Sequence, residues 1–187
     1  MNVLIQLVWA VVKGIDRFTL WIGLSVRWLV ALITALMGYE VVMRYVFASP
    51  QGWSYDSTVM IGAVYFLYSA SYTLLVNGHI RVDLLYHRYG LRRQKLIDVV
   101  GAALFMFPPL VALLHRGWYF AWRAIEVGEE SHWSFYHLPM APLRFAILIG
   151  FVILMLQLVS WFIRQCHTLI TGSEVVPEAV RTSRSEA

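Results

Sequence analysis

The residue best suited to do chemistry in this sequence is Glu40, which lies in an apolar run from residue 18 to residue 47. A carboxylate within such a run can serve as a proton or substrate site, since an ionisable group there is costly unless it has a partner or a function. Arg44 follows one helical turn later, in the order that favours an ion pair. The spacing therefore favours a structural ion pair, and a proton or substrate site at Glu40 is the alternative.

Histidines are the second group that could do chemistry. His132 and His137 lie close to Glu129 and Glu130, a set of side chains that can bind a metal ion, but their spacing matches no standard ligand pattern. Haem ligation needs histidines that face each other at compatible depths, whereas the histidines here fall in expected loops, at helix ends or near a surface. There is no nucleophile–base constellation, phosphate loop or zinc motif. The sequence predicts neither an enzyme nor a cofactor site.

The composition identifies the class of protein. Of the 187 residues, 59% are hydrophobic and only 14% are charged, against about 25% charged residues in an average soluble domain. The apolar residues fall in blocks, which predicts a polytopic membrane protein. The net charge of +4 equals the positive excess of one short loop, residues 77–95, which favours contact with membrane lipids over binding of nucleic acid.

The apolar blocks predict an all-α integral membrane protein with a single four-helix membrane domain over residues 1–172. The four transmembrane helices are expected at about 18–47, 57–76, 96–120 and 143–163. Residues 1–17 are too short an apolar run to cross the membrane, so we expect an interfacial or helix-extending lead-in. Residues 173–187 are polar and predict a disordered cytoplasmic tail.

Local signals suggest how the second and third spans begin and bend. Ser54 and Asp56 follow a turn with Pro50 and Gly52, and both are candidates to cap the second helix. Pro108 and Pro109 lie near the middle of the third span. Because paired prolines remove amide donors, we expect a kink there.

Small and polar residues suggest how the spans pack. Gly62, Ser69 and Thr73 fall near one face of the second span and predict close helix packing along that face. Gln157 lies at membrane depth in the fourth span, where an interhelical hydrogen bond is the simplest role for its amide.

A basic segment separates the second and third spans. Residues 77–95 hold five cations against the single acid Asp83. A helical wheel over residues 80–90 places most of the apolar side chains on one side, and Gly90 follows as a C-terminal stop. This predicts a short amphipathic interfacial helix at about 80–90. The positive-inside rule puts this segment and both termini in the cytoplasm.

Three ordered motifs resemble one family of membrane proteins. They are Glu40-Val41 with Arg44-Tyr45-Val46-Phe47, then Trp53-x-x-Asp56, then Gly78-His79-Ile80-Arg81-Val82-Asp83-Leu84-Leu85. Over roughly residues 20–165 the chain resembles the small membrane subunit of tripartite ATP-independent periplasmic (TRAP) transporters, the DctQ family. One departure is that the family commonly has paired acids after the Trp, whereas this chain has Ser54-Tyr55-Asp56. An ion pair between this turn and Arg44 would then depend on Asp56.

The resemblance implies a function and a set of partners. A periplasmic solute-binding protein captures an organic acid or related small solute, and a large permease subunit transports it by an elevator-type movement driven by a sodium gradient. The small subunit is a scaffold in the bacterial inner membrane. The positions carried over as structural or partner contacts are Arg44, Trp53, Asp56, Gly78, His79, Arg81 and Asp83. The alternative function is a self-sufficient small proton-coupled transporter that uses Glu40.

Overall fold

The computed structural model describes residues 2–76, 90–131, 137–172 and 177. This part of the chain contains helices and no strand, apart from one isolated bridge between Glu130 and Pro139. The elements in chain order are α1 (Asn2–Tyr45), α2 (Gly52–Leu75), α4 (Leu91–Gly101), the π-helical turn η1 (Ala102–Met106), α5 (Phe107–Val127) and α6 (Ala141–Thr171). Within them, 4 candidate spans are long and apolar enough to cross a membrane. The predicted all-α membrane fold is confirmed.

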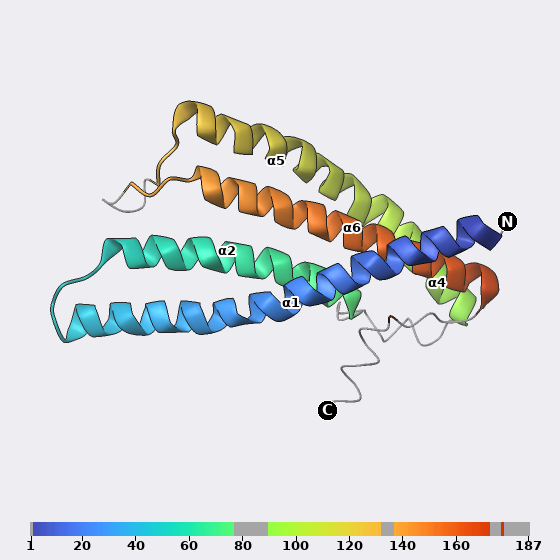
Figure 1. Cartoon of the computed structure of the whole chain (residues 1–187), viewed down its shortest axis with the longest axis horizontal. Coiled ribbons are helices and arrows are strands. Elements are labelled where there is room, and N and C mark those ends of the chain that lie inside the picture. The colour runs from blue at the N-terminus through green and yellow to red at the C-terminus, as the bar shows by residue number, and fades with distance from the viewer. Residues whose placement is uncertain (1, 77–89, 132–136, 173–176, 178–187) are drawn as a thin grey trace.

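The helices form two antiparallel hairpins that lie side by side (Figure 1). One hairpin is α1 with α2, the other is α5 with α6, and α6 packs against α1, α2, α4 and α5. The ends of α1 and α5 and the starts of α2 and α6 lie at one end of the bundle, here called the hairpin end. The N-terminus, the start of α4 and the end of α6 lie at the opposite, terminal end. The N-terminal half of α1 crosses α6 there.

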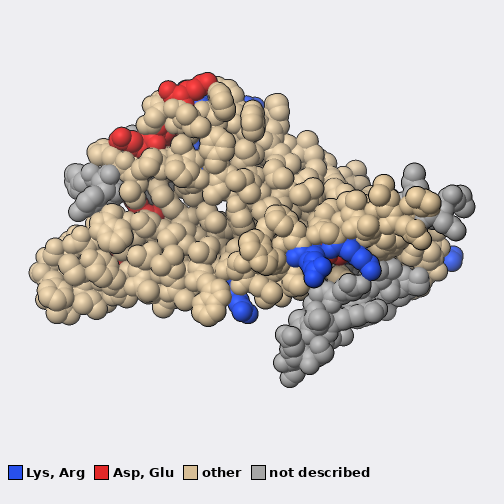
Figure 2. Space-filling model, viewed as in Figure 1, with Lys and Arg blue, Asp and Glu red and all other residues tan. Residues whose placement is uncertain are grey.

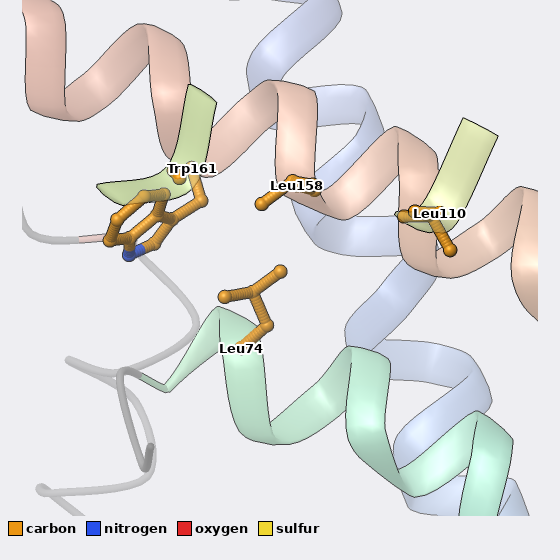
Figure 3. Close-up of a cluster of buried hydrophobic side chains, with 5 residues drawn as sticks. Leu74, Leu110, Leu158 and Trp161 are labelled. Atoms are coloured by element: carbon orange, nitrogen blue, oxygen red, sulfur yellow. The ribbon is translucent and has the colours of Figure 1, made fainter. Parts of the chain in front are cut away.

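The apolar core is gathered around α6. Leu74 of α2, Leu110 of α5 and Leu158 and Trp161 of α6 converge in one cluster (Figure 3), which Ala102 completes. Many large apolar side chains on the outward faces of the helices are exposed. Exposed apolar faces around a compact centre are what a bundle surrounded by lipid requires, because lipid tails are as apolar as the side chains.

Two glycines allow the closest helix contacts. A Cβ atom built on Gly23 of α1 would lie 2.6 Å from Cγ of Tyr72, and one on Gly150 of α6 would lie 2.6 Å from Cδ2 of Leu67. A Cβ built on Gly62 would meet nothing within 4 Å. The prediction of close packing is therefore wrong at Gly62, because that part of α2 faces open space.

The helices are longer than the predicted spans, since the third span is helical over residues 92–127 and α6 ends at Thr171. Residues 2–17 belong to α1, so the lead-in extends the first helix. The second helix begins at Gly52, with Gln51 as an N-cap that makes no side-chain capping bond. The capping roles predicted for Ser54 and Asp56 are therefore wrong, since both residues lie inside the first turns of α2.

The two prolines of the third span occupy the first turn of α5, immediately after η1. The helical run from Arg92 to Val127 is continuous, so both prolines lie within it, where each removes one amide donor from the helix. A π-helical turn changes the register of the backbone hydrogen bonds just ahead of them. The predicted interfacial helix, apart from Gly90, and the predicted tail, apart from Pro177, lie outside the described residues.

Candidate functional site

The first candidate site lies at the hairpin end, around Glu40. Oε1 of Glu40 accepts hydrogen bonds from Nη2 of Arg44 at 2.7 Å and from Nε of Arg44 at 3.3 Å. Oε2 of Glu40 accepts the backbone N–H of Gln51 at 3.1 Å. The indole N–H of Trp53 donates to Oε1 of Gln51 at 3.3 Å, and the Trp53 ring lies 5.9 Å from that of Tyr39. Both carboxylate oxygens of Glu40 are thus engaged in holding the α1–α2 turn.

A groove opens beside this pair. Its volume is about 420 Å³, and it lies between the end of α1 and the start of α2. Apart from Glu40 and Arg44, its walls are mostly apolar or aromatic. They include Met37, Val41 and Tyr55. Ser54 and Thr58 also line the groove, but their hydroxyl groups donate to backbone carbonyl oxygens. The charge pair is therefore the main polar feature left to orient a small polar solute, and pockets for such solutes normally offer several converging polar groups.

Asp56 takes part in a different contact from the Glu40 pair. Oδ2 of Asp56 accepts a hydrogen bond from Oγ of Ser131 at 2.8 Å, and both residues are buried. Two residues earlier, Oγ of Ser54 donates to the carbonyl oxygen of Leu36 at 3.3 Å. The two side chains that were expected to cap α2 therefore join it to α1 and to the segment after α5.

The segment after α5 is held by Arg144. Its guanidinium pairs with Glu129, donates to the carbonyl oxygen of Phe120 at 3.1 Å, and lies 5.4 Å from the centre of the Phe120 ring. Nδ1 of His137 lies 3.3 Å from Oε2 of Glu130, with both side chains exposed. Among the described residues no group of three His, Cys, Asp or Glu side chains could hold a metal ion. His132 lies outside them.

The second candidate site is buried near the terminal end and centres on Asp16. Oδ1 of Asp16 accepts hydrogen bonds from Oγ of Ser160 at 2.8 Å and from Nε2 of Gln157 at 3.1 Å. Its other oxygen, Oδ2, pairs with Nη1 of Arg164. Relative exposure is 8% for Asp16, 0% for Gln157 and Ser160 and 3% for Arg164. We call these four residues the Asp16 clamp.

The clamp follows from helical spacing on α6. Gln157, Ser160 and Arg164 recur at intervals of three and four residues, which puts them on one face of the helix. Asp16 faces them from the part of α1 that was predicted to be a lead-in. The sequence pointed to the amide of Gln157 as an interhelical donor, but it identified neither Asp16 nor Arg164 as a site residue. The polar periodicity of α6 was the available signal.

Some polar atoms of the clamp carry no hydrogen bond to any described residue. They are Oε1 of Gln157 and Nη2 of Arg164. Oγ1 of Thr19, one turn further along α1, likewise makes no hydrogen bond to a described residue. Removing a partner from such a site leaves a buried charge without compensation, which costs far more than losing an exposed contact. The clamp therefore fixes where α1 crosses α6.

Charge is distributed unevenly between the two ends. On the face drawn in Figure 2, acidic side chains gather near the hairpin end, and most basic ones lie toward the terminal end. Of the predicted site residues, Glu40, Arg44 and Trp53 are brought together, Asp56 lies in a separate contact, and Gln157 belongs to the clamp. Gly78, His79, Arg81 and Asp83 lie outside the described residues.

One family model matches this chain. Its description is "Tripartite ATP-independent periplasmic transporters, DctQ component", and the match covers residues 33–168. No curated protein and no solved structure gives a match. The matched range includes the first candidate site and the α6 residues of the Asp16 clamp. Asp16 itself lies before the matched range, as does all of α1 before residue 33.

Proposed function

The chain belongs to the DctQ component family of tripartite ATP-independent periplasmic transporters, and from this premise we propose that it acts as the scaffold of a sodium-driven importer. It is the small subunit of such a transporter and a multi-pass protein of the bacterial inner membrane. In the proposed role it transports nothing itself and holds the large permease subunit in place.

The observation that carries this proposal is the engagement of Glu40. Its side chain is 14% exposed, and both of its oxygens accept hydrogen bonds, from Arg44 and from the Gln51 backbone. A carboxylate that carries protons or solute across a membrane must exchange its partners during each cycle. The contacts of Glu40 instead close the α1–α2 turn, which favours the scaffold over a self-sufficient proton-coupled transporter.

The partners and the solute follow from the family. A periplasmic solute-binding protein delivers the solute to the large permease, which moves it by an elevator-type motion coupled to sodium. The solute is an organic acid or a related small molecule. Gly78, His79, Arg81 and Asp83 lead into the interfacial helix predicted at about 80–90, which would widen the rigid frame around the permease.

Both termini lie in the cytoplasm in this proposal. The described cations Lys13, Arg17, Arg92 and Arg93 lie at the terminal end, whereas Glu129 and its acidic neighbours lie at the hairpin end. The hairpin end also carries arginines, among them Arg44 and Arg144, but they pair with Glu40 and Glu129. The positive-inside rule places the end with the excess of Lys and Arg residues in the cytoplasm. Labelling of single cysteines placed at either end with an impermeant reagent tests this orientation.

Co-expression with the large permease tests the scaffold role. We expect the two chains to purify together after solubilisation, and Glu40→Gln to leave that association intact. A chain that never associates with the permease, and that moves solute alone in liposomes until Glu40→Gln is made, would overturn the proposal in favour of the proton-coupled alternative.

A further inference from the structure

The first helix has a charged side chain wherever it crosses the membrane. A crossing needs about 20 residues, but the longest stretch of α1 without Asp, Glu, Lys or Arg is 28–39, which is 12 residues. The other three candidate spans contain longer stretches of this kind, with 17 to 19 residues, at 57–75, 99–115 and 145–163. Every 20-residue segment of α1 includes Arg17, Arg27 or both.

The contacts of α1 place Arg27 at the depth of the hydrocarbon layer. Val26 packs in one cluster with Ile153 of α6, and Leu29 lines a pocket with Ala146 of α6. Arg27 is therefore level with the part of α6 between these two residues, which lies within the uncharged stretch of that helix. Of all the 20-residue segments of α1, those with the fewest charges contain only Arg27, near their middle.

The side chain of Arg27 faces away from the bundle. It is exposed, whereas the neighbouring Val26 is 8% exposed. The Arg27 guanidinium makes no ion pair with a described residue, and its Cζ lies 5.7 Å from the centre of the Trp28 ring. Charged residues at membrane depth almost always face protein or a water-filled cavity, because a lone charge among lipid tails is costly. The position of Arg27 therefore requires a partner outside this chain.

The surface beside Arg27 leaves room for a neighbouring helix. Ala31, Thr34 and Gly38 follow at intervals of three and four residues on the same side of α1, and all three are exposed. A Cβ built on Gly38 would meet nothing within 4 Å, so no other part of the described chain covers it. Small side chains let two membrane helices approach closely. We call Arg27, Ala31, Thr34 and Gly38 the Arg27 face.

Lipid phosphates do not meet the need of Arg27 for a partner. Side chains of a helix lean toward its N-terminus, so that of Arg27 leans toward the terminal end of the bundle. On that side the next charge of α6 is Arg164, which lies 11 residues beyond Ile153. This is about 16 Å of helix, farther than an arginine side chain extends.

A second copy of this chain does not offer the missing charge either. In α1 and α2, the carboxylates of Asp16, Glu40 and Asp56 each accept hydrogen bonds within their own chain. There is no acidic residue in α6, and the acids of the third span lie outside its uncharged stretch. Charge complementarity therefore points to a carboxylate on a membrane helix of another protein.

We propose that the Arg27 face is the contact surface for a membrane helix of the large permease subunit, and that Arg27 pairs there with an Asp or Glu of that helix. The inference rests on the proposed function, which supplies the permease as the partner. Because the side chain leans toward the terminal end, the acid lies on that side of the level of Arg27. Arg27 is paired only in the assembled transporter, so its charge serves association rather than folding.

Photocrosslinking tests which molecule covers this face. Benzoylphenylalanine replaces Leu24, which lies three residues before Arg27 on the same side of α1 and is 42% exposed. The matched control replaces Phe105, in the turn before α5, which is 78% exposed. After co-expression with the permease and irradiation in the membrane, the label at Leu24 should attach to the permease in much higher yield than the label at Phe105. Mass spectrometry of the product should locate a permease helix with an Asp or Glu near the attachment point.

Charge variants test the ion pair, with association measured by energy transfer between labelled subunits in lipid vesicles. Arg27→Glu should weaken association at least about a hundredfold, because two carboxylates then face each other at membrane depth, and changing the permease acid to Arg should restore it. Arg27→Lys should stay within about fivefold of the unaltered chain, since it keeps the charge. Arg116→Glu is the matched control. Arg116 directly follows the uncharged stretch of its span, where the side chain reaches the headgroups, so association should change little.

Several results would overturn the inference. They are unchanged association of Arg27→Glu, equal loss in Arg116→Glu, failure of the exchanged charges to restore association, and attachment of the Leu24 label only to lipid or to a second copy. A fall in the Tm of the isolated chain for Arg27→Glu as large as the fall for Asp16→Asn would make Arg27 a folding contact instead. If the unaltered chain does not associate with the permease at all, the proposed function itself fails, so the two failures are distinguishable.

Discussion

Asp16→Asn changes the shape of a side chain very little, but it should lower the stability of the folded protein strongly. The amide has nearly the shape of the carboxylate and can still accept a hydrogen bond from Ser160, but it has no charge to compensate Arg164. The side chain of Arg164 is 4% exposed, so water cannot take over that role. Breaking a buried ion pair in this way costs about 3–5 kcal/mol.

The size of the effect separates the clamp from ordinary surface contacts. For a chain of this length the loss corresponds to a fall in Tm of about 10 °C, measured by thermal unfolding of the purified protein in detergent. Adding Arg164→Gln to Asp16→Asn removes both charges and should recover part of the lost stability. Glu40→Gln, which opens a pair whose Arg44 side chain is 54% exposed, is the control and should lower Tm only slightly.

Two outcomes would refute this reasoning. A change in Tm for Asp16→Asn no larger than that for Glu40→Gln would mean that Asp16 and Arg164 do not form a compensated buried pair. Losses for Asp16→Asn and Arg164→Gln that simply add in the double variant would mean that the two side chains are not coupled, because contacting residues show an interaction energy in such a cycle.

Other contacts lead to further predictions. Gly23→Ala and Gly150→Ala should each destabilise the bundle by about 1–3 kcal/mol, because the added methyl group is forced into a neighbouring helix. Chemical unfolding in mixed micelles measures this loss, and Gly62→Ala, where the methyl group enters open space, is the control that should not destabilise the bundle. Equal losses at all three positions would contradict the packing described. Ser131→Ala should cost about 1.5–3 kcal/mol, since the buried Asp56 carboxylate loses a hydrogen bond, and the same unfolding experiment detects it; an unchanged unfolding midpoint would show that this contact contributes nothing.

The four membrane helices could be predicted from the sequence because apolar runs of about 20 residues have few other stable structures. Contacts within one helix could also be predicted from the sequence. Glu40 and Arg44 lie four residues apart, which brings the two side chains onto adjoining turns whatever the tertiary structure.

Contacts between distant parts of the chain could not be predicted from the sequence in the same way. Gln157 and Asp16 are 141 residues apart, and an acid in a short apolar lead-in does not reveal which helix it will meet. The start of α2 was misplaced for a related reason. Ser54 and Asp56 are typical capping residues, but their side chains bond to Leu36 of α1 and to Ser131, and tertiary contacts of this kind override local preference.

The scaffold role itself is tested most directly by solute uptake into proteoliposomes under a sodium gradient, with the large permease and the binding protein present. The account predicts uptake only when this chain is included, no uptake by this chain alone, and nearly normal uptake with Glu40→Gln. Uptake by this chain in the absence of the permease, abolished by Glu40→Gln, would contradict it.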